Sequence, residues 1–205
     1  MTGSEADGRA RRRSYAKGIT RRRQIIDGAI GEIADHGVDG ASLRGMSEAI
    51  GVSHAALRHY FASRDELLVE VYRAHEQQSA DAAQDTASAV AYMLESAERN
   101  RAVPGLVQLY ATLTTDALQQ SHPLSAEFIT ERFASLRAEL AARVRAAQTV
   151  GAVAAEIDPE SAAALVIAAS DGLQIQWLLD PDQVDVRRSL ALLERLLPGS
   201  RTDGD

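Results

Sequence analysis

SLRGMSEAIGVSHAALRHYF, residues 42–61, is the stretch that decides the fold. It divides into two short segments with helically spaced apolar residues, and each follows a serine that can cap a helix, Ser42 and Ser53. Gly51 stands between them, where the chain must leave the first helix with a positive φ. Two short helices joined by a tight glycine turn form the unit that lays its second helix in the major groove of DNA, although another helical hairpin could show the same pattern.

The sequence before this stretch divides into two parts. Apolar residues recur at helical spacing over residues 21–36, beginning at Ile25, and His36-Gly37 is typical of a helix C-cap. Residues 1–19 mix Gly, Ser, Asp and Arg and show no hydrophobic period. We therefore expect a flexible basic arm followed by a first helix.

The sequence after the stretch predicts further helices. Ser63 and Glu66 have the spacing of a capping box, and the helix that they begin should continue past Gln78. Asp-Pro pairs suit helix starts, with Asp at the cap and Pro in the first turn. Prolines punctuate the remaining apolar-periodic segments at Pro104, Pro123, Asp158-Pro159, Asp180-Pro181 and Pro198. Aromatic residues are only 4% of the chain and alanine is abundant, so we expect an all-α fold of about nine helices.

Composition and charge exclude several classes of protein. The chain has no cysteine, which removes disulfides, thiolate nucleophiles and zinc sites built from sulfur. No signal-peptide core is visible, and uninterrupted apolar stretches are too short to span a bilayer, so we expect a soluble, cytoplasmic protein without a membrane partner. Residues 1–64 carry eleven Lys or Arg and seven Asp or Glu, a balance of +4, whereas the whole chain carries −7. A basic head on an acidic body indicates that the head meets a polyanion.

The motif resembles the DNA-binding signature of the TetR family of transcriptional regulators. The resemblance rests on residues 42–53, on Leu57-Arg58-His59-Tyr60-Phe61 and on Arg64-Asp65-Glu66-Leu67-Leu68, and it extends from residue 20 to about 70. It implies a flexible arm over residues 1–19, a helix-turn-helix domain over 20–65 and a helical effector-binding and dimerisation domain over 66–205. Arg58 stands where that family often has Tyr, so the family's operator rules do not carry over directly, and Ser47 stands where it usually has Ala, which predicts a slightly looser core around the second helix.

The resemblance implies which residues meet double-stranded DNA. Arginine can bind guanine edges, alanine can meet a thymine methyl, and Ser, His and Tyr can donate to phosphates. The expected DNA-binding residues are Arg44, Ser53, His54, Ala55, Ala56, Arg58, His59, Tyr60 and Arg64. Arg21, Arg22 and Arg23 form a possible basic arm that enters a minor groove or raises the local cation density. An arm of no consequence is the alternative.

The remainder of the chain predicts a pocket and a dimer. Aromatic and soft side chains at Tyr72, Tyr92, Met93, Tyr110, Phe128, Phe133 and Trp177 could line a pocket for an unknown small-molecule effector, although such stripes are more often simply core. Broad apolar faces over residues 162–178 and 190–197 imply, by the resemblance, a homodimer through the last two helices. An ordinary intramolecular core is the alternative.

Catalytic and metal-binding motifs are missing from the sequence. None of the five histidines pairs at i, i+4 around a glutamate, and there is no Gly-rich phosphate loop or Gly-x-Ser-x-Gly elbow. We therefore expect no enzyme, no metal and no cofactor, and we expect a repressor released from a palindromic operator by its effector. The alternatives are an activator or architectural DNA-binding protein without an effector, and a helical enzyme.

Overall fold

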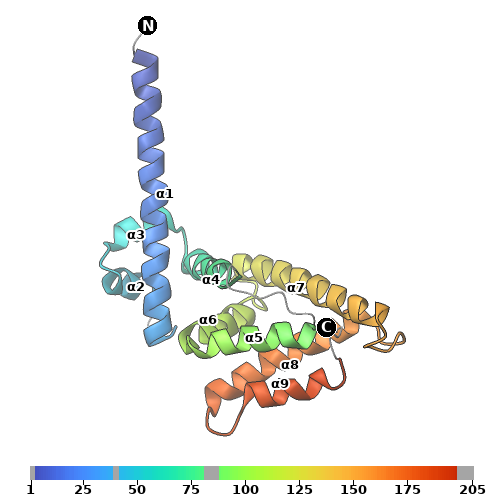
Figure 1. Cartoon of the computed structure of the whole chain (residues 1–205). Coiled ribbons are helices and arrows are strands. Elements are labelled where there is room, and N and C mark those ends of the chain that lie inside the picture. The colour runs from blue at the N-terminus through green and yellow to red at the C-terminus, as the bar shows by residue number, and fades with distance from the viewer. Residues whose placement is uncertain (1–2, 39–41, 81–87, 198–205) are drawn as a thin grey trace, which may run out of the picture.

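The computed structural model describes residues 3–38, 42–80 and 88–197. All the regular secondary structure in these ranges is helical, which confirms the expected all-α class (Figure 1). The helices are α1 (Gly3–His36), α2 (Leu43–Ala49), α3 (His54–Tyr60), α4 (Arg64–Ala80), α5 (Ala89–Arg101), α6 (Pro104–Asp116), α7 (Pro123–Thr149), α8 (Pro159–Leu179) and α9 (Val186–Glu194).

Helix α1 is longer than the sequence pattern predicts. The structure continues the helix back to Gly3 through most of residues 1–19, where we expected a flexible arm, and Figure 1 shows this part projecting beyond the rest of the molecule. The segment contains no proline but three Ala, four Arg and one Glu, which are good helix formers. Once the buried half of α1 provides a nucleus, the helix can propagate without a hydrophobic face. Residues 1 and 2 lie outside the described part of the chain.

Local signals form the N-terminal helical head, α1 to α3. The hydroxyl of Ser42 accepts a hydrogen bond from the N–H of Gly45, and that of Ser53 accepts one from the N–H of Ala56, so both predicted N-caps are confirmed. Gly51 has a φ of +68°, which is the left-handed conformation that the turn between α2 and α3 requires. Leu57 of α3 is fully buried. Its opposite face is thereby turned outward.

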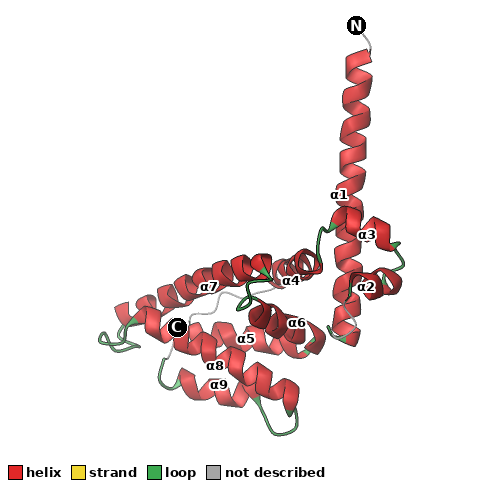
Figure 2. Ribbon diagram, turned by 180° about the vertical axis from the view of Figure 1, so that it is seen from behind, coloured by secondary structure: helices red, strands yellow, loops and turns green. Residues whose placement is uncertain are grey.

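Helices α4 to α9 form the body, and one apolar core joins it to the head. Figure 2 shows α4 leaving the head and entering the bundle. Buried residues of α1, α4, α6 and α7, among them Ile33, Leu68, Leu109 and Phe128, belong to the same hydrophobic cluster. The body is therefore packed directly on the helix that supports α2 and α3.

The Asp-Pro pairs have two different roles. Asp158 caps α8 as predicted, because its carboxylate accepts a hydrogen bond from the N–H of Ser161. The prediction for Asp180-Pro181 was wrong, because Asp180 ends α8 and Pro181 enters a turn. The following helix begins instead at Val186 with Asp185 as its cap.

Helix α8 is long and apolar enough to cross a membrane by length and composition alone, with a mean hydropathy of 1.4 over its best window. No long uninterrupted apolar stretch marks this helix in the sequence, because Ser161, Ser170, Asp171 and Gln174 interrupt it. In the structure α8 packs against α5, α6, α7 and α9. Its buried Gln174 accepts a hydrogen bond from Asn100 of α5 at 2.6 Å. A core helix of a bundle has this composition too.

Candidate nucleic-acid interface and ligand pocket

Helix α3 presents an exposed polar face. His54, Ala55, Arg58 and His59 are all exposed, while Leu57 anchors the helix from the other side. Ala56 and Tyr60 are half-buried at the edges of this face. The helix has the length and surface that base-edge contacts in a major groove require. All six predicted α3 contacts thus lie on or beside one accessible face, four of them exposed and two at its edge.

The predicted contacts outside α3 have different environments. Arg44 of α2 is exposed and forms an ion pair with Glu48 at 3.2 Å, one turn along the helix. Arg64 is half-buried at the start of α4. The hydroxyl of Ser53 is already used as a helix cap. Exposed pairs of this kind exchange easily with phosphate oxygens, because they contribute at most about 1 kcal/mol.

The three arginines expected to form a basic arm point to different partners. Arg21 and Arg23 are exposed. Arg22 instead contacts α4, with ion pairs to Glu70 at 2.7 Å and Glu66 at 3.5 Å. Its guanidinium also lies 4.7 Å from the centre of the Phe61 ring. Arg22 therefore fastens α1 to the start of the body, and the assignment of Arg22 to a DNA-binding arm does not fit this position.

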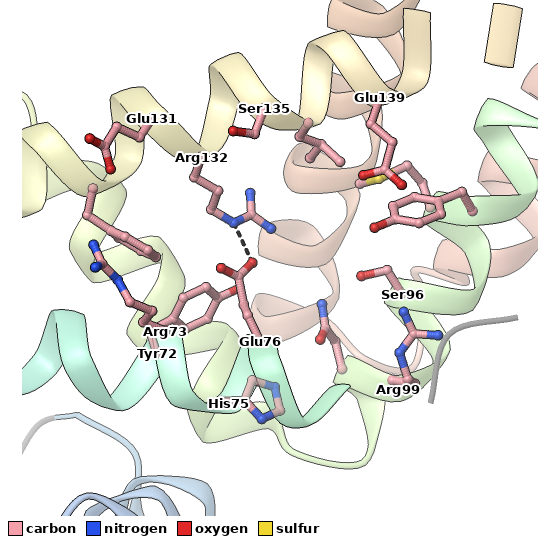
Figure 3. A pocket seen from close by; sticks show the side chains of 15 residues that line it. Tyr72, Arg73, His75, Glu76, Ser96, Arg99, Glu131, Arg132, Ser135 and Glu139 are labelled. Atoms are coloured by element: carbon pink, nitrogen blue, oxygen red, sulfur yellow. Dashed lines mark hydrogen bonds and ion pairs between the residues drawn. The ribbon is translucent and has the colours of Figure 1, made fainter. Parts of the chain in front are cut away.

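A pocket of about 370 Å³ opens between α4, α5 and α7 in the body. Figure 3 shows its polar side chains, with Arg132 reaching from α7 towards Glu76 of α4. Four of the seven candidate residues line it, namely Tyr72, Tyr92, Met93 and Phe128. The other three do not: Tyr110 stacks behind Tyr72, Phe133 packs between two core clusters, and Trp177 packs beside α9.

A chain of polar contacts beside this pocket joins four helices. Asp171 of α8 accepts a hydrogen bond from the Tyr110 hydroxyl at 2.8 Å. The hydroxyl oxygen of Tyr110 in turn accepts a hydrogen bond from Arg132 at 3.1 Å. Arg132 also donates to Glu76 of α4 at 2.6 Å. The sequence reading missed Arg132, Glu76 and Asp171. No local signal marks them, because Glu76 and Arg132 are 56 positions apart.

Burial sets the protonation of the groups around the pocket. It raises the pKa of Tyr72 and of Tyr110 above their usual range, so both phenols are neutral at physiological pH. Burial also raises the pKa of Asp171, against the opposing effects of the Tyr110 hydrogen bond and the Arg132 charge. Burial lowers the pKa of His75, so this ring is mainly uncharged at neutral pH. Within the described residues no group of three or more His, Asp or Glu side chains could hold a metal ion.

Comparison with known proteins assigns both parts of the chain to one family. The family model described as bacterial regulatory proteins, tetR family, matches residues 25–71. The model of the BetI-type transcriptional repressor C-terminal region matches residues 115–200. The two matches together include α2 and α3 of the head and α7, α8 and α9 of the body.

Individual relatives agree with these matches. The regulator PksA of Bacillus subtilis is 37% identical over 67 residues, which is 33% of each chain, and the repressor AcnR of Corynebacterium efficiens is 35% identical over 57 residues, which is 28% of this chain and 30% of AcnR. The aligned part thus spans about a third of these curated relatives.

Solved structures match over the whole fold. A TetR transcription regulator from Haloarcula marismortui has a TM-score of 0.72 at 15% identity, covering 87% of this chain and 96% of that one. A transcriptional regulator from Rhodococcus has a TM-score of 0.69 at 18% identity, covering 86% and 95%. The chain therefore belongs to the TetR family of transcriptional regulators.

Proposed function

We propose that the protein is a cytoplasmic, sequence-specific DNA-binding repressor that acts as a homodimer and is released from a palindromic operator by a small-molecule effector. The exposed polar face of α3 carries this proposal, because the exposed side chains of Arg58, His54 and Ala55 do not pack in the core. Relatives named as transcriptional repressors support the direction of regulation. The domain division that we propose is a DNA-binding head over residues 20–65 and a body over 66–205.

Base recognition is proposed for α3 and phosphate binding for its surroundings. Arg58, His54 and Ala55 are the residues that we expect to read base edges, with Arg44 at the start of α2. His59, Tyr60 and Ala56 lie on or beside the same face of α3, and together with Ser53 at its N-cap and Arg64 at the start of α4 they would fix the register of the head on the DNA backbone.

The α8 and α9 surface is proposed as the dimer interface. Leu165, Ile175 and Leu179 of α8 and Leu192 and Leu196 beside them are all exposed, although they are large and apolar. An apolar surface of this kind marks an interaction site, and a two-fold axis through it would place two heads at a fixed spacing. Homodimerisation explains both the exposed leucines of α8 and its high hydropathy.

Operator binding is the first test. Fluorescence anisotropy with DNA from upstream of the gene, repeated with sequence selected from random DNA if that fails, should give sequence-specific binding that weakens as salt rises. Arg58→Ala should reduce the preference for the selected site over scrambled DNA by about tenfold or more, since a bidentate base contact contributes about 1–3 kcal/mol. Arg137→Ala, an exposed arginine of α7, is the matched control and should leave the preference unchanged. Binding that remains indifferent to sequence after selection would contradict the proposal.

A further inference from the structure

The charges that line the pocket are unevenly compensated. Glu76 is paired with Arg132 at 2.6 Å, and Glu139 is paired with Arg143 of its own helix at 3.0 Å. Arg99 of α5 has a weaker contact, with Glu95 of its own helix at 4.0 Å. Arg99 therefore has the longest of these three ion pairs and is the arginine most able to bind another anion.

Figure 3 places the groups at this side of the pocket. Ser96 and Arg99 lie near each other on α5, Glu139 of α7 lies on the same side with its carboxylate paired to Arg143, and Glu131 lies at the opposite end of the pocket. The neighbouring His75 is mainly uncharged at neutral pH, because burial lowers its pKa. Hydroxyl and guanidinium groups both donate hydrogen bonds, so this end of the pocket suits an oxyanion.

The aromatic side chains of the pocket are poorly placed for a cationic ligand. A quaternary ammonium needs open aromatic faces around it. In this pocket the chain's own guanidinium groups lie over the rings at 4.5 to 5.9 Å, Arg73 over Phe128, Arg132 over Tyr72 and Arg143 over Tyr92. A cation would therefore meet rings that guanidinium groups already cover, and two of the pocket's three glutamates, Glu76 and Glu139, are already paired with arginines.

Building on the effector pocket of the proposed function, we propose that the effector is a small organic anion. Its carboxylate or equivalent oxyanion binds Arg99 and Ser96 of α5, across the pocket from Arg132. Its apolar part lies against Met93 and Leu136, which also line the pocket. Guanidinium binds carboxylate through charge-assisted hydrogen bonds, which are the strong ones. The chemical class follows from the charge and from the covered rings.

The position of Arg132 connects this anion to the head. A second anion near Arg132 competes with Glu76 for its charge, and Glu76 lies on α4. The first half of α4 carries Glu66 and Glu70, which hold Arg22 of α1. Weakening the contact between Glu76 and Arg132 frees the second half of the helix that joins the pocket to the head. A ligand shifts such an equilibrium only by binding one arrangement better than the other.

Calorimetry with charge-matched probes tests the chemical class. The probes are a panel of short alkyl and aryl carboxylates, their primary amides and their trimethylammonium analogues. We expect carboxylates to bind best, Arg99→Gln to weaken that binding by about tenfold or more, and Glu76→Gln to strengthen it by removing the competing carboxylate. Arg101→Gln, an exposed arginine two positions along α5 that lines a different pocket, is the matched control and should bind like the wild-type protein.

The outcomes separate this inference from the proposed function. The proposal of an anionic effector would be overturned if no carboxylate bound at millimolar concentration, if the amides bound as well as the carboxylates, or if Arg99→Gln bound the carboxylates as tightly as the wild-type protein. Release of operator DNA by a neutral or cationic probe would support the effector function of the proposed repressor but would contradict an anionic effector. Binding of a carboxylate at Arg99 without any change in operator affinity would keep the anion site and overturn the effector function.

Discussion

At the scale of single residues, Gly105 marks a very close approach of the body to the head. A Cβ built at this position would fall inside van der Waals distance of the backbone carbonyl of Ile33, near the end of α1. Backbone atoms cannot turn aside as the end of a flexible side chain can. The first turn of α6 can therefore lie on α1 only because residue 105 has no side chain.

Substitution of Gly105 tests this contact. We expect Gly105→Ala to lower the free energy of unfolding by about 1–3 kcal/mol, as overpacking does, in urea denaturation. Gly31→Ala on the exposed side of α1 is the control, because a Cβ there meets nothing within 4 Å. It should raise stability by up to about 1 kcal/mol through helix propensity. Equal effects of the two substitutions would contradict the close approach.

His75 should make stability depend on pH. Burial lowers its pKa in the folded protein below the ordinary value of 6.5, with Glu76 opposing and Arg99 reinforcing the shift. The unfolded chain then binds more protons than the folded protein as pH falls below about 6.5, so folding loses stability there and regains it above. Urea denaturation at several pH values should show a smaller loss in His75→Gln than in the wild-type protein. His59→Gln, the same substitution at an exposed position of α3, provides the matched control.

At the scale of helices, Arg22 determines how α1 meets α4. Its contacts with Glu66, Glu70 and Phe61 are partly buried, so Arg22→Gln should cost about 1–2 kcal/mol of unfolding free energy. Arg21→Gln, which removes only an exposed contact, should change stability by less than about 0.5 kcal/mol.

The salt dependence of DNA binding distinguishes a structural Arg22 from a DNA contact. Loss of a phosphate contact lowers the logarithmic salt slope by about 0.9. We expect Arg22→Gln to leave the slope unchanged even where affinity falls. A reduced slope would restore Arg22 to the basic arm that its sequence position suggests.

Local sequence signals determined which elements could be predicted. Ser42, Ser53 and Gly51 act on their immediate neighbours, so the helix-turn-helix could be read directly from their spacing. The extent of α1 could not be predicted in this way, because its outer half has no hydrophobic pattern. That half is helical because its residues favour a helix and because it continues from the packed half of α1. Asp180-Pro181 fits a helix start equally well as a sequence, but here it ends α8, because the residue before a proline avoids the helical conformation and Asp180 has a φ of −147° and a ψ of 75°.

The pocket was only partly predictable because its polar residues come from distant segments. Aromatic residues at helical spacing pointed to Tyr72, Tyr92 and Phe128, whereas Trp177 has the same character and packs elsewhere. Arg132 joins Glu76 and Tyr110 only after α4, α6 and α7 have packed together. Sequence can indicate which residues are able to bind a ligand, but three-dimensional packing decides which of them meet.

For the whole molecule, dimerisation determines how strongly two heads hold one palindrome. Leu165 and Ile175 are 57% and 47% exposed on α8, so the pair Leu165→Glu and Ile175→Glu places charge on the proposed interface without disturbing the core. Sedimentation should show a dimer for the wild-type protein and a monomer for this variant, and circular dichroism should show the same helix content. Affinity for the full palindrome should fall by about a hundredfold or more, because the second half-site is no longer linked to the first.

A matched leucine separates the interface from a general loss of apolar surface. Leu118, between α6 and α7, is 87% exposed and lies outside α8 and α9, so Leu118→Glu should remain a dimer with wild-type operator affinity. A monomeric wild-type protein, or a double variant that stays dimeric, would contradict the α8 and α9 interface. If the double variant is a monomer that still binds a half-site as the wild-type head does, each head recognises its half-site independently of the other. Their spacing in the dimer is then the quantity that an effector in the body has to change.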